Sequence, residues 1–210
     1  MFNNFELMES DLRRRAQELP YIWGRKQNND FDSMTRDVYN IKDLQSLLLK
    51  YPNDRSDLSN YAHNRWFNFH SAKCIEDIFC SHPGVVRENN KYHQSIDFYI
   101  NGVPYDHKTT VLPRSFYGSL NVTDTEDFEI SLIRWLYKNQ STGQMYHLGN
   151  RLFLVVIDSY DLESSWKVKA ELSLIKEHID MFIGNGGNIY NFRCEETGTR
   201  FSSGIIVVRV

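Results

Sequence analysis

Cysteine and long apolar runs are both scarce in this chain of 210 residues. The three cysteines, Cys74, Cys80 and Cys194, show no paired spacing, which excludes a disulfide framework and is typical of buried free thiols in a reducing compartment. No apolar run approaches the roughly 20 residues of a membrane helix. Residues 1–4 lack the basic and apolar regions of a secretory signal. We therefore expect a cytoplasmic protein with no membrane partner.

An excess of one charge is also missing, because 24 basic and 27 acidic residues leave a formal net charge of −3. This excludes a polycation that binds nucleic acid over its whole surface, so phosphate contact would need a local basic patch. Aromatic residues, in contrast, are plentiful: 13 Phe, 12 Tyr and 4 Trp, within 41% hydrophobic residues. That composition predicts a folded core, and the length suffices for one domain.

The most informative stretch, residues 95–109, carries Asn-Gly at positions 101–102. Asn-Gly between runs of β-branched and aromatic residues favours a hairpin with a two-residue type I′ turn. Counting outward from the turn pairs Ile100 with Val103, Tyr99 with Pro104, Phe98 with Tyr105, and Asp97 with Asp106. The pairs alternate between hydrogen-bonded and non-bonded types, so Pro104 falls where its missing N–H is not needed.

This register brings two acids and an amine to one place. Asp97 is expected opposite Asp106, and Lys108 follows on the same strand face as Asp106. Opposed carboxylates repel, so a hairpin that only supports the fold rarely contains them. Mg²⁺ would remove the repulsion, because one or two carboxylates typically bind it together with water and phosphate oxygens. Lys108 would then orient or activate water, or stabilise charge on a phosphate. The alternative is exposed strand residues with a weak surface ion pair.

Asp97 followed by Asp106-His107-Lys108 resembles the signature of the PD-(D/E)xK nuclease superfamily, with Ile96 where that family often has proline. The resemblance implies a restriction-endonuclease-like fold and metal-dependent hydrolysis of phosphodiesters. It implies that Asp97 and Asp106 bind Mg²⁺, or Mn²⁺ in its place, and that the backbone carbonyl of His107 is a further ligand. The His107 side chain should point to the opposite face, where a core role is expected.

A long helix is predicted over residues 57–81, because Ser56 or Ser59 can cap its start and His-Pro-Gly at 82–84 ends it. Glu76 ends a largely aromatic face of this helix that includes Phe69. A buried acid needs a partner, and the resemblance implies that this helix supplies an additional acid near the metal. Glu76 is therefore a candidate site residue. The alternative is a surface ion pair with Lys73, one turn away.

The other patterns complete an α/β chain (α+β, with a mixed sheet). Helices are predicted over 5–19, 41–51, 123–139 and 162–184, and strands over 84–87, 151–158, 188–194 and 201–210. From residue 57 to 158 the order is αβββαβ, which is the core of the restriction-endonuclease-like fold. We predict one nuclease-like domain over 1–210, with an N-terminal helical extension (1–56), this core, and a C-terminal helix and β-hairpin (159–210).

The leading hypothesis is a Mg²⁺-dependent DNA endonuclease of the restriction or repair type, with Arg65, Lys73 and Arg114 as nucleic-acid contacts. Replacing Asp106 or Lys108 by alanine should abolish cleavage without unfolding the protein. Two alternatives remain open: a nuclease-fold subunit that binds nucleic acid or joins a complex without catalysis, and a junction resolvase acting on branched DNA. A homodimer fits the hypothesis, because cutting both strands of a duplex commonly uses two active sites. The sequence does not decide between DNA and RNA.

Overall fold

The computed structural model describes residues 2–23, 30–90, 95–119, 125–139, 149–193 and 198–210. The chain divides into two compact units. The first comprises Met1–Ile75 with Lys169–Ser173, and the second comprises Glu76–Val168 with Leu174–Val210. The division falls inside a long helix, not at residue 57, where the sequence pattern separates an N-terminal extension from a core.

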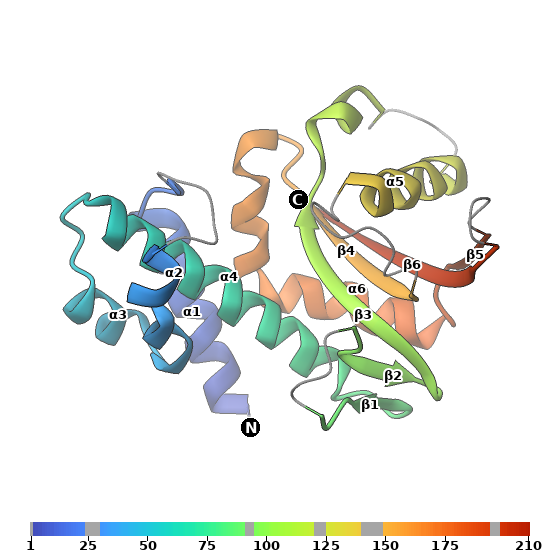
Figure 1. The fold of residues 1–210 in the computed structure, drawn as a ribbon, viewed down its shortest axis with the longest axis horizontal. Coiled ribbons are helices and arrows are strands. Elements are labelled where there is room, and N and C mark those ends of the chain that lie inside the picture. The colour runs from blue at the N-terminus through green and yellow to red at the C-terminus, as the bar shows by residue number, and fades with distance from the viewer. Residues whose placement is uncertain (1, 24–29, 91–94, 120–124, 140–148, 194–197) are drawn as a thin grey trace. The chain divides into compact units, whose positions relative to one another are not determined.

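The first unit is helical (Figure 1). Its elements are α1 (Phe2–Glu18), α2 (Asp30–Met34), the 3₁₀ helix η1 (Arg36–Asn40), α3 (Leu44–Lys50) and most of α4 (Asp57–Phe79). The helices predicted over 5–19, 41–51 and 57–81 are confirmed as α1, α3 and α4. Helix α3 begins later than predicted, because the side chain of Asp43 caps it by accepting the Ser46 N–H at 2.7 Å.

The second unit contains a six-stranded mixed sheet in the order β1-β2-β3-β4-β6-β5. Its strands are β1 (Val85–Arg87), β2 (Phe98–Ile100), β3 (Val103–Val111), β4 (Arg151–Ile157), β5 (Ile189–Arg193) and β6 (Arg200–Arg209). Strand β4 is parallel to both β3 and β6, whereas β1–β2, β2–β3 and β5–β6 are antiparallel. The predicted α/β class with a mixed sheet is confirmed.

The order of elements along the sheet unit follows the predicted sequence of helices and strands. After α4 come β1, β2, β3, the 3₁₀ helix η2 (Arg114–Ser119), α5 (Thr125–Asn139) and β4. The capping-box residue Thr123, which the sequence places before α5, lies outside the described residues. Helix α5 connects two parallel strands, as a crossover helix must.

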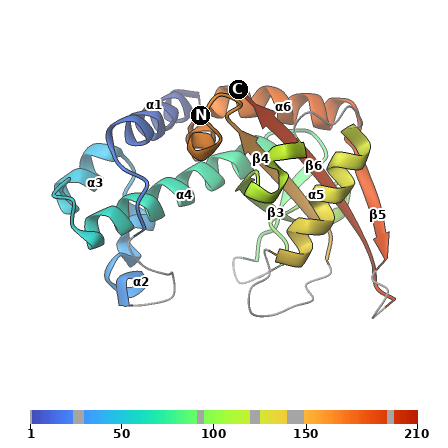
Figure 2. The same cartoon turned by 90° about the horizontal axis from the view of Figure 1, so that it is seen from above.

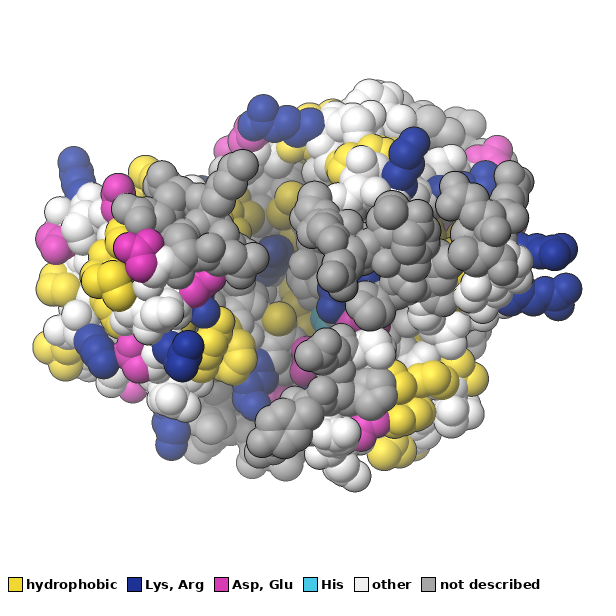
Figure 3. Space-filling view, in the orientation of Figure 1, with side chains coloured by type: hydrophobic (Ala, Val, Ile, Leu, Met, Phe, Trp, Pro, Cys, Tyr) yellow, Lys and Arg dark blue, Asp and Glu magenta, His cyan; other side chains and the backbone are white. Residues whose placement is uncertain are grey.

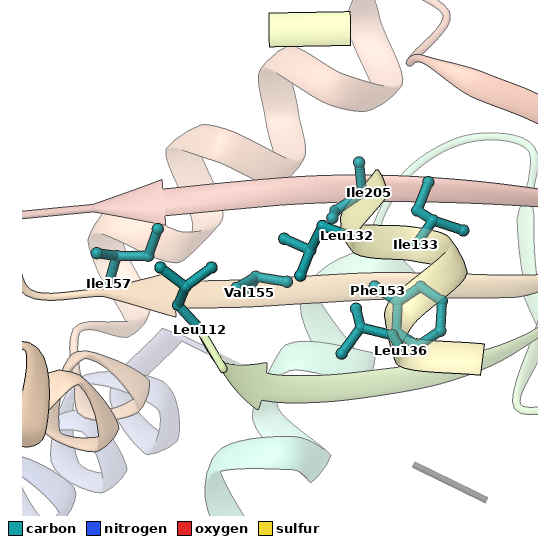
Figure 4. Packing of buried hydrophobic residues seen from close by; sticks show 8 residues of the cluster. All are labelled: Leu112, Leu132, Ile133, Leu136, Phe153, Val155, Ile157 and Ile205. Carbon is teal, nitrogen blue, oxygen red and sulfur yellow. The ribbon is translucent and has the colours of Figure 1, made fainter. Parts of the chain in front are cut away.

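Helix α5 covers one face of the sheet and α6 (Leu172–Gly184) the other (Figure 2). Figure 4 shows the core under α5, where Leu132 and Leu136 of the helix pack near Phe153 and Val155 of β4. Every residue of β4 is buried, because the strand has neighbours on both edges and helices on both faces. This burial explains why its sequence is continuously apolar after Arg151.

The single helix predicted over 162–184 is wrong, since the structure has a 3₁₀ helix η3 (Leu162–Ala170) followed by α6. The start of α6 is held by a residue distant in sequence. Glu9 of α1 accepts the backbone N–H of Ser173 at 2.8 Å and its hydroxyl at 2.7 Å. This carboxylate satisfies a free donor of the first helical turn, so a new helix begins there.

The hairpin between β2 and β3 has the predicted turn. Asn101 and Gly102 have φ of 50° and 82°, the positive values that a type I′ turn requires. The predicted pairs Phe98–Tyr105, Tyr99–Pro104 and Ile100–Val103 are confirmed. The fourth pair is wrong: the ladder ends at Phe98, and the N–H of Asp97 donates to the carbonyl of Tyr105 at 2.9 Å.

Two expectations from composition can be compared with the structure. None of the helices in the described ranges is both long and apolar enough to cross a membrane. Cys74 and Cys80 are free thiols and are partly buried, and Cys194 lies outside the described residues.

The turn predicts different outcomes for two glycine substitutions. Gly102 has positive φ, Gly118 does not, and neither would crowd an added Cβ. Gly102→Ala should therefore lower the free energy of unfolding by about 1 kcal/mol through backbone strain. Gly118→Ala should leave it unchanged or raise it by up to about 0.5 kcal/mol. Urea unfolding of both variants measures the difference, and equal effects would contradict the turn geometry.

Candidate functional site

Asp106 lies between two cations. Lys108, two residues along β3, donates from Nζ to Oδ1 of Asp106 at 2.5 Å. The parallel register places Arg151 of β4 beside Asp106, and its Nε donates to Oδ2 at 3.1 Å. Asp106 is 8% exposed and Arg151 7%, whereas the Lys108 side chain is 46% exposed. The carboxylate therefore has one buried and one solvent-facing cation.

Asp97 reaches the same stretch of β3 from the end of the ladder. Its Oδ2 accepts the backbone N–H of His107 at 2.7 Å. Because the N–H and C=O of a strand residue point to the same edge, the His107 carbonyl faces the edge where Asp97 lies. The predicted meeting of Asp97 with the Asp106–Lys108 segment is present, but a side chain bound to the backbone produces it, not a cross-strand pair.

Glu76 lies near the end of α4. Its Oε2 accepts a hydrogen bond from Nη1 of Arg87 in β1 at 3.1 Å, and Arg87 also pairs with Asp77 at 2.5 Å. The ion-pair partner of Glu76 is thus an arginine of the neighbouring strand and not Lys73, the partner that helical spacing alone suggested. The Glu76 side chain is 25% exposed.

The three acids are electrostatically linked. Burial raises the pKa of Asp97, the His107 N–H and the charge of Lys108 oppose this, and the charge of Asp106 raises the pKa further. Burial and then the charge of Asp97 raise the pKa of Glu76, against the lowering effect of Arg87. Burial is the largest cause in both cases, and the charge of a neighbouring acid adds to it. A cation bound beside these acids would favour their charged forms.

His107 points to the opposite face of β3, as strand alternation predicts. Its ring packs with centroids 5.4 Å from Phe79 and 6.1 Å from Phe98, and its Nε2 lies 3.2 Å from Oγ1 of Thr109. Burial lowers the pKa of His107 to about 3, so the imidazole is neutral near pH 7. The side chain is a core residue, and only its backbone faces the acids.

The three predicted nucleic-acid contacts, Arg65, Lys73 and Arg114, differ in exposure and in their partners within the protein. Arg65 is 13% exposed and donates to the carbonyl of Asp32 at 2.7 Å and to Oγ1 of Thr35 at 2.8 Å. The Arg65 guanidinium therefore already has hydrogen-bond acceptors within the helical unit and does not need a phosphate as a partner. Lys73 is exposed, and Arg114 is exposed and pairs with Glu163.

Figure 3 shows Lys and Arg side chains of the described residues at several separate places, with acidic side chains near some of them. Lys73 and Arg114 are therefore treated as individual exposed cations for phosphate contact.

The donor atoms suit a hard divalent cation. The described residues contain no group of three or more His, Cys, Asp or Glu placed to hold a metal. Mg²⁺ needs fewer protein ligands, because water and phosphate oxygens complete its octahedron. The carboxylates of Asp97 and Asp106 and the carbonyl of His107 supply oxygen donors, and the two carboxylates are close enough that, besides burial, the charge of Asp106 raises the pKa of Asp97. The site fits Mg²⁺ or Mn²⁺ on these grounds.

Arg151 is the site residue that sequence reasoning missed. It stood in the sequence as the first residue of an otherwise apolar strand, which is an unusual place for a charge. That signal indicates a buried partner but does not identify it. The partner follows only from the parallel register of β3 and β4, which pairs Arg151 with Asp106.

Burial of the Asp106–Arg151 pair revises the expectation that Asp106→Ala leaves the fold intact. Removing the carboxylate leaves a buried cation unpaired, which should lower the free energy of unfolding by about 3 kcal/mol. Glu163→Ala breaks the exposed pair with Arg114 and should cost less than about 0.5 kcal/mol. Chemical unfolding of both variants compares the pairs, and a cost of Asp106→Ala as small as that of Glu163→Ala would contradict the burial of this charge.

Removing the charge of Asp97 should raise the free energy of unfolding, whereas removing that of Asp106 should lower it. Because the pKa of Asp97 is raised in the fold, the folded protein binds the proton more tightly than the unfolded chain does, and stability is lost as pH rises through that raised pKa. Asp97→Asn keeps an acceptor for the His107 N–H and removes the charge. In chelator at pH 7 it should raise the free energy of unfolding, by less than about 1 kcal/mol because the group is partly screened by solvent. A decrease would contradict the electrostatic assignment.

The chain matches no protein-family model, no curated protein and no solved structure. The geometry around Asp97, Asp106 and Lys108 is therefore the basis on which a function is assigned.

Proposed function

We propose that this chain is a Mg²⁺-dependent endonuclease that hydrolyses phosphodiester bonds of DNA. One observation carries the proposal: two interacting carboxylates, Asp97 and Asp106, lie with the solvent-facing amine of Lys108 where the β2–β3 ladder ends. Two adjacent carboxylates repel each other, and a divalent cation bound between them would relieve that repulsion. Metal-assisted hydrolysis of a phosphodiester can use both acids as ligands and the exposed amine to stabilise charge on the phosphate.

Each residue has a role in that chemistry. Asp97 and Asp106 would hold the ion together with the carbonyl of His107, and Glu76 would accept hydrogen bonds from its outer waters. A bound Mg²⁺ supplies a Lewis acid for the phosphate and lowers the pKa of water. Lys108 orients the attacking water or stabilises charge that develops on the phosphate, because its amine is exposed beside the acids.

The arrangement of elements supports a restriction-endonuclease-like fold. The order α4-β1-β2-β3-α5-β4, with β3 parallel to β4, agrees with the αβββαβ core that the resemblance implies. DNA as the substrate rests on the same resemblance. Lys73 and Arg114 are the exposed cations proposed to contact its backbone, and a homodimer would supply the second site needed to cut both strands.

Cleavage of plasmid DNA in Mg²⁺ or Mn²⁺ tests the proposal. Wild-type protein should convert supercoiled plasmid to nicked and linear forms, and chelator should stop the reaction. Asp106→Asn, which preserves the shape of the buried pair, and Lys108→Met should each lower the rate at least about 100-fold, because each removes a group that acts in the transition state. Gel analysis of initial rates provides the measurement.

Exposed residues of α6 provide matched controls for these variants. Glu177→Gln and Lys176→Met change the same charges away from the site and should cleave at the wild-type rate. Activity that survives Asp106→Asn or Lys108→Met would place the chemistry elsewhere. Mn²⁺ binding without cleavage of linear, branched or single-stranded DNA would mean a binding subunit.

A further inference from the structure

The two cations on Asp106 use different oxygens. Arg151 donates to Oδ2 and Lys108 to Oδ1. Each oxygen of the Asp106 carboxylate thus accepts from a different cation: Oδ2 from a residue of the adjacent strand, and Oδ1 from a residue of the same strand. Only the Oδ1 contact involves a side chain that solvent can reach.

Arg151 is held in place on several sides. Its side chain is 9% exposed, and its guanidinium lies over the ring of Tyr137 of α5 at 5.2 Å from the centroid. The Tyr137 hydroxyl donates to the carbonyl of Gly149, and the backbone carbonyl of Arg151 accepts the hydroxyl of Ser203. A guanidinium stacked on an aromatic ring and bonded to a buried acid has little freedom to move.

Lys108 is held only loosely by comparison. Its side chain is 46% exposed, and its ammonium sits on a flexible four-carbon stem. Water can solvate this ammonium when it leaves Oδ1, whereas the Arg151 guanidinium is buried together with the carboxylate. The Lys108 contact is therefore the less costly of the two to break.

We propose that Arg151 is a positioning residue that anchors Asp106 through Oδ2, so that Oδ1 is presented to the metal when Lys108 moves away. Lys108 is the exchangeable cation of the pair: it covers Oδ1 and is released toward the phosphate when the ion binds. The inference rests on the proposed metal site of Asp97 and Asp106 and adds a residue that the family resemblance does not supply.

The two cations should then have opposite effects on metal affinity. Calorimetric titration of Mn²⁺ into DNA-free protein measures this without any cleavage. Arg151→Met keeps an apolar stem against Tyr137 but removes the anchor, and should weaken binding at least about tenfold, as loss of a group that orients a ligand does. Lys108→Met removes the competing amine and should tighten binding about threefold. Arg151→Lys should stay within about threefold of wild type, because it retains a donor for Oδ2.

Two exposed pairs give controls of the same chemistry. Arg14→Met and Lys176→Met each remove a surface cation that pairs with a carboxylate, and both should bind Mn²⁺ as wild type does. Thermal unfolding in chelator establishes that each variant is folded. If Arg151→Met does not fold, Arg151→Gln replaces it, because its neutral amide satisfies the buried Oδ2 but binds it less strongly than a cation does, and it should weaken binding more than Arg151→Lys.

The outcomes separate this inference from the proposed function. Failure of the wild-type protein to bind Mn²⁺, or to lose binding on Asp106→Asn, would overturn the metal site and the inference with it. Wild-type affinity in Arg151→Met or Arg151→Gln would overturn the anchor alone. Unchanged or weaker affinity in Lys108→Met would overturn the exchange of cations, and this variant remains decisive because an exposed side chain can be replaced without loss of the fold.

Discussion

A carboxylate that is 8% exposed needs compensating charge, and Asp106 has it from Arg151 and Lys108. The position of β3 makes this possible. On one edge, β3 pairs with the parallel strand β4, whose first residue is Arg151. On the other edge, the antiparallel ladder with β2 ends at Tyr105, so β2 does not pair with Asp106 or His107. The Asp106–His107 peptide is left for the carboxylate of Asp97. The acids meet at this position because the antiparallel β2–β3 ladder ends at Tyr105 and the parallel β3–β4 pairing begins at Asp106.

The two faces of β3 have different surroundings. On one face of β3, His107 packs with Phe79 and Phe98 and stays neutral, so this face supports the strand. On the other face, Asp106 and Lys108 point out beside Arg151. Burial raises the pKa values of Asp97 and Glu76, so their charged forms lower the stability of the fold. Natural proteins accept such a cost at functional sites, where a ligand offsets it.

Local geometry was predictable from the sequence, and contacts between distant segments were not. The Asn-Gly turn and strand alternation predicted three ladder pairs and the shared face of Asp106 and Lys108, because both depend only on backbone geometry. The end of the ladder was not predictable, since it depends on the Asp97 carboxylate taking the His107 N–H. Arg151 is 45 residues from Asp106, and Glu9 is 164 residues from Ser173, which it caps in the first turn of α6. Neither contact leaves a periodic signal in the sequence.

The central claim is that Asp97 and Asp106 bind one divalent ion between them. Anomalous diffraction from a crystal of the wild-type protein grown with Mn²⁺ tests it most directly. The account predicts a manganese peak within about 2–2.5 Å of an oxygen of each carboxylate, with Arg151 still on Oδ2 of Asp106 and Lys108 displaced from Oδ1. A protein that takes up manganese elsewhere, or leaves the Lys108–Asp106 contact in place at saturating Mn²⁺, would contradict the account.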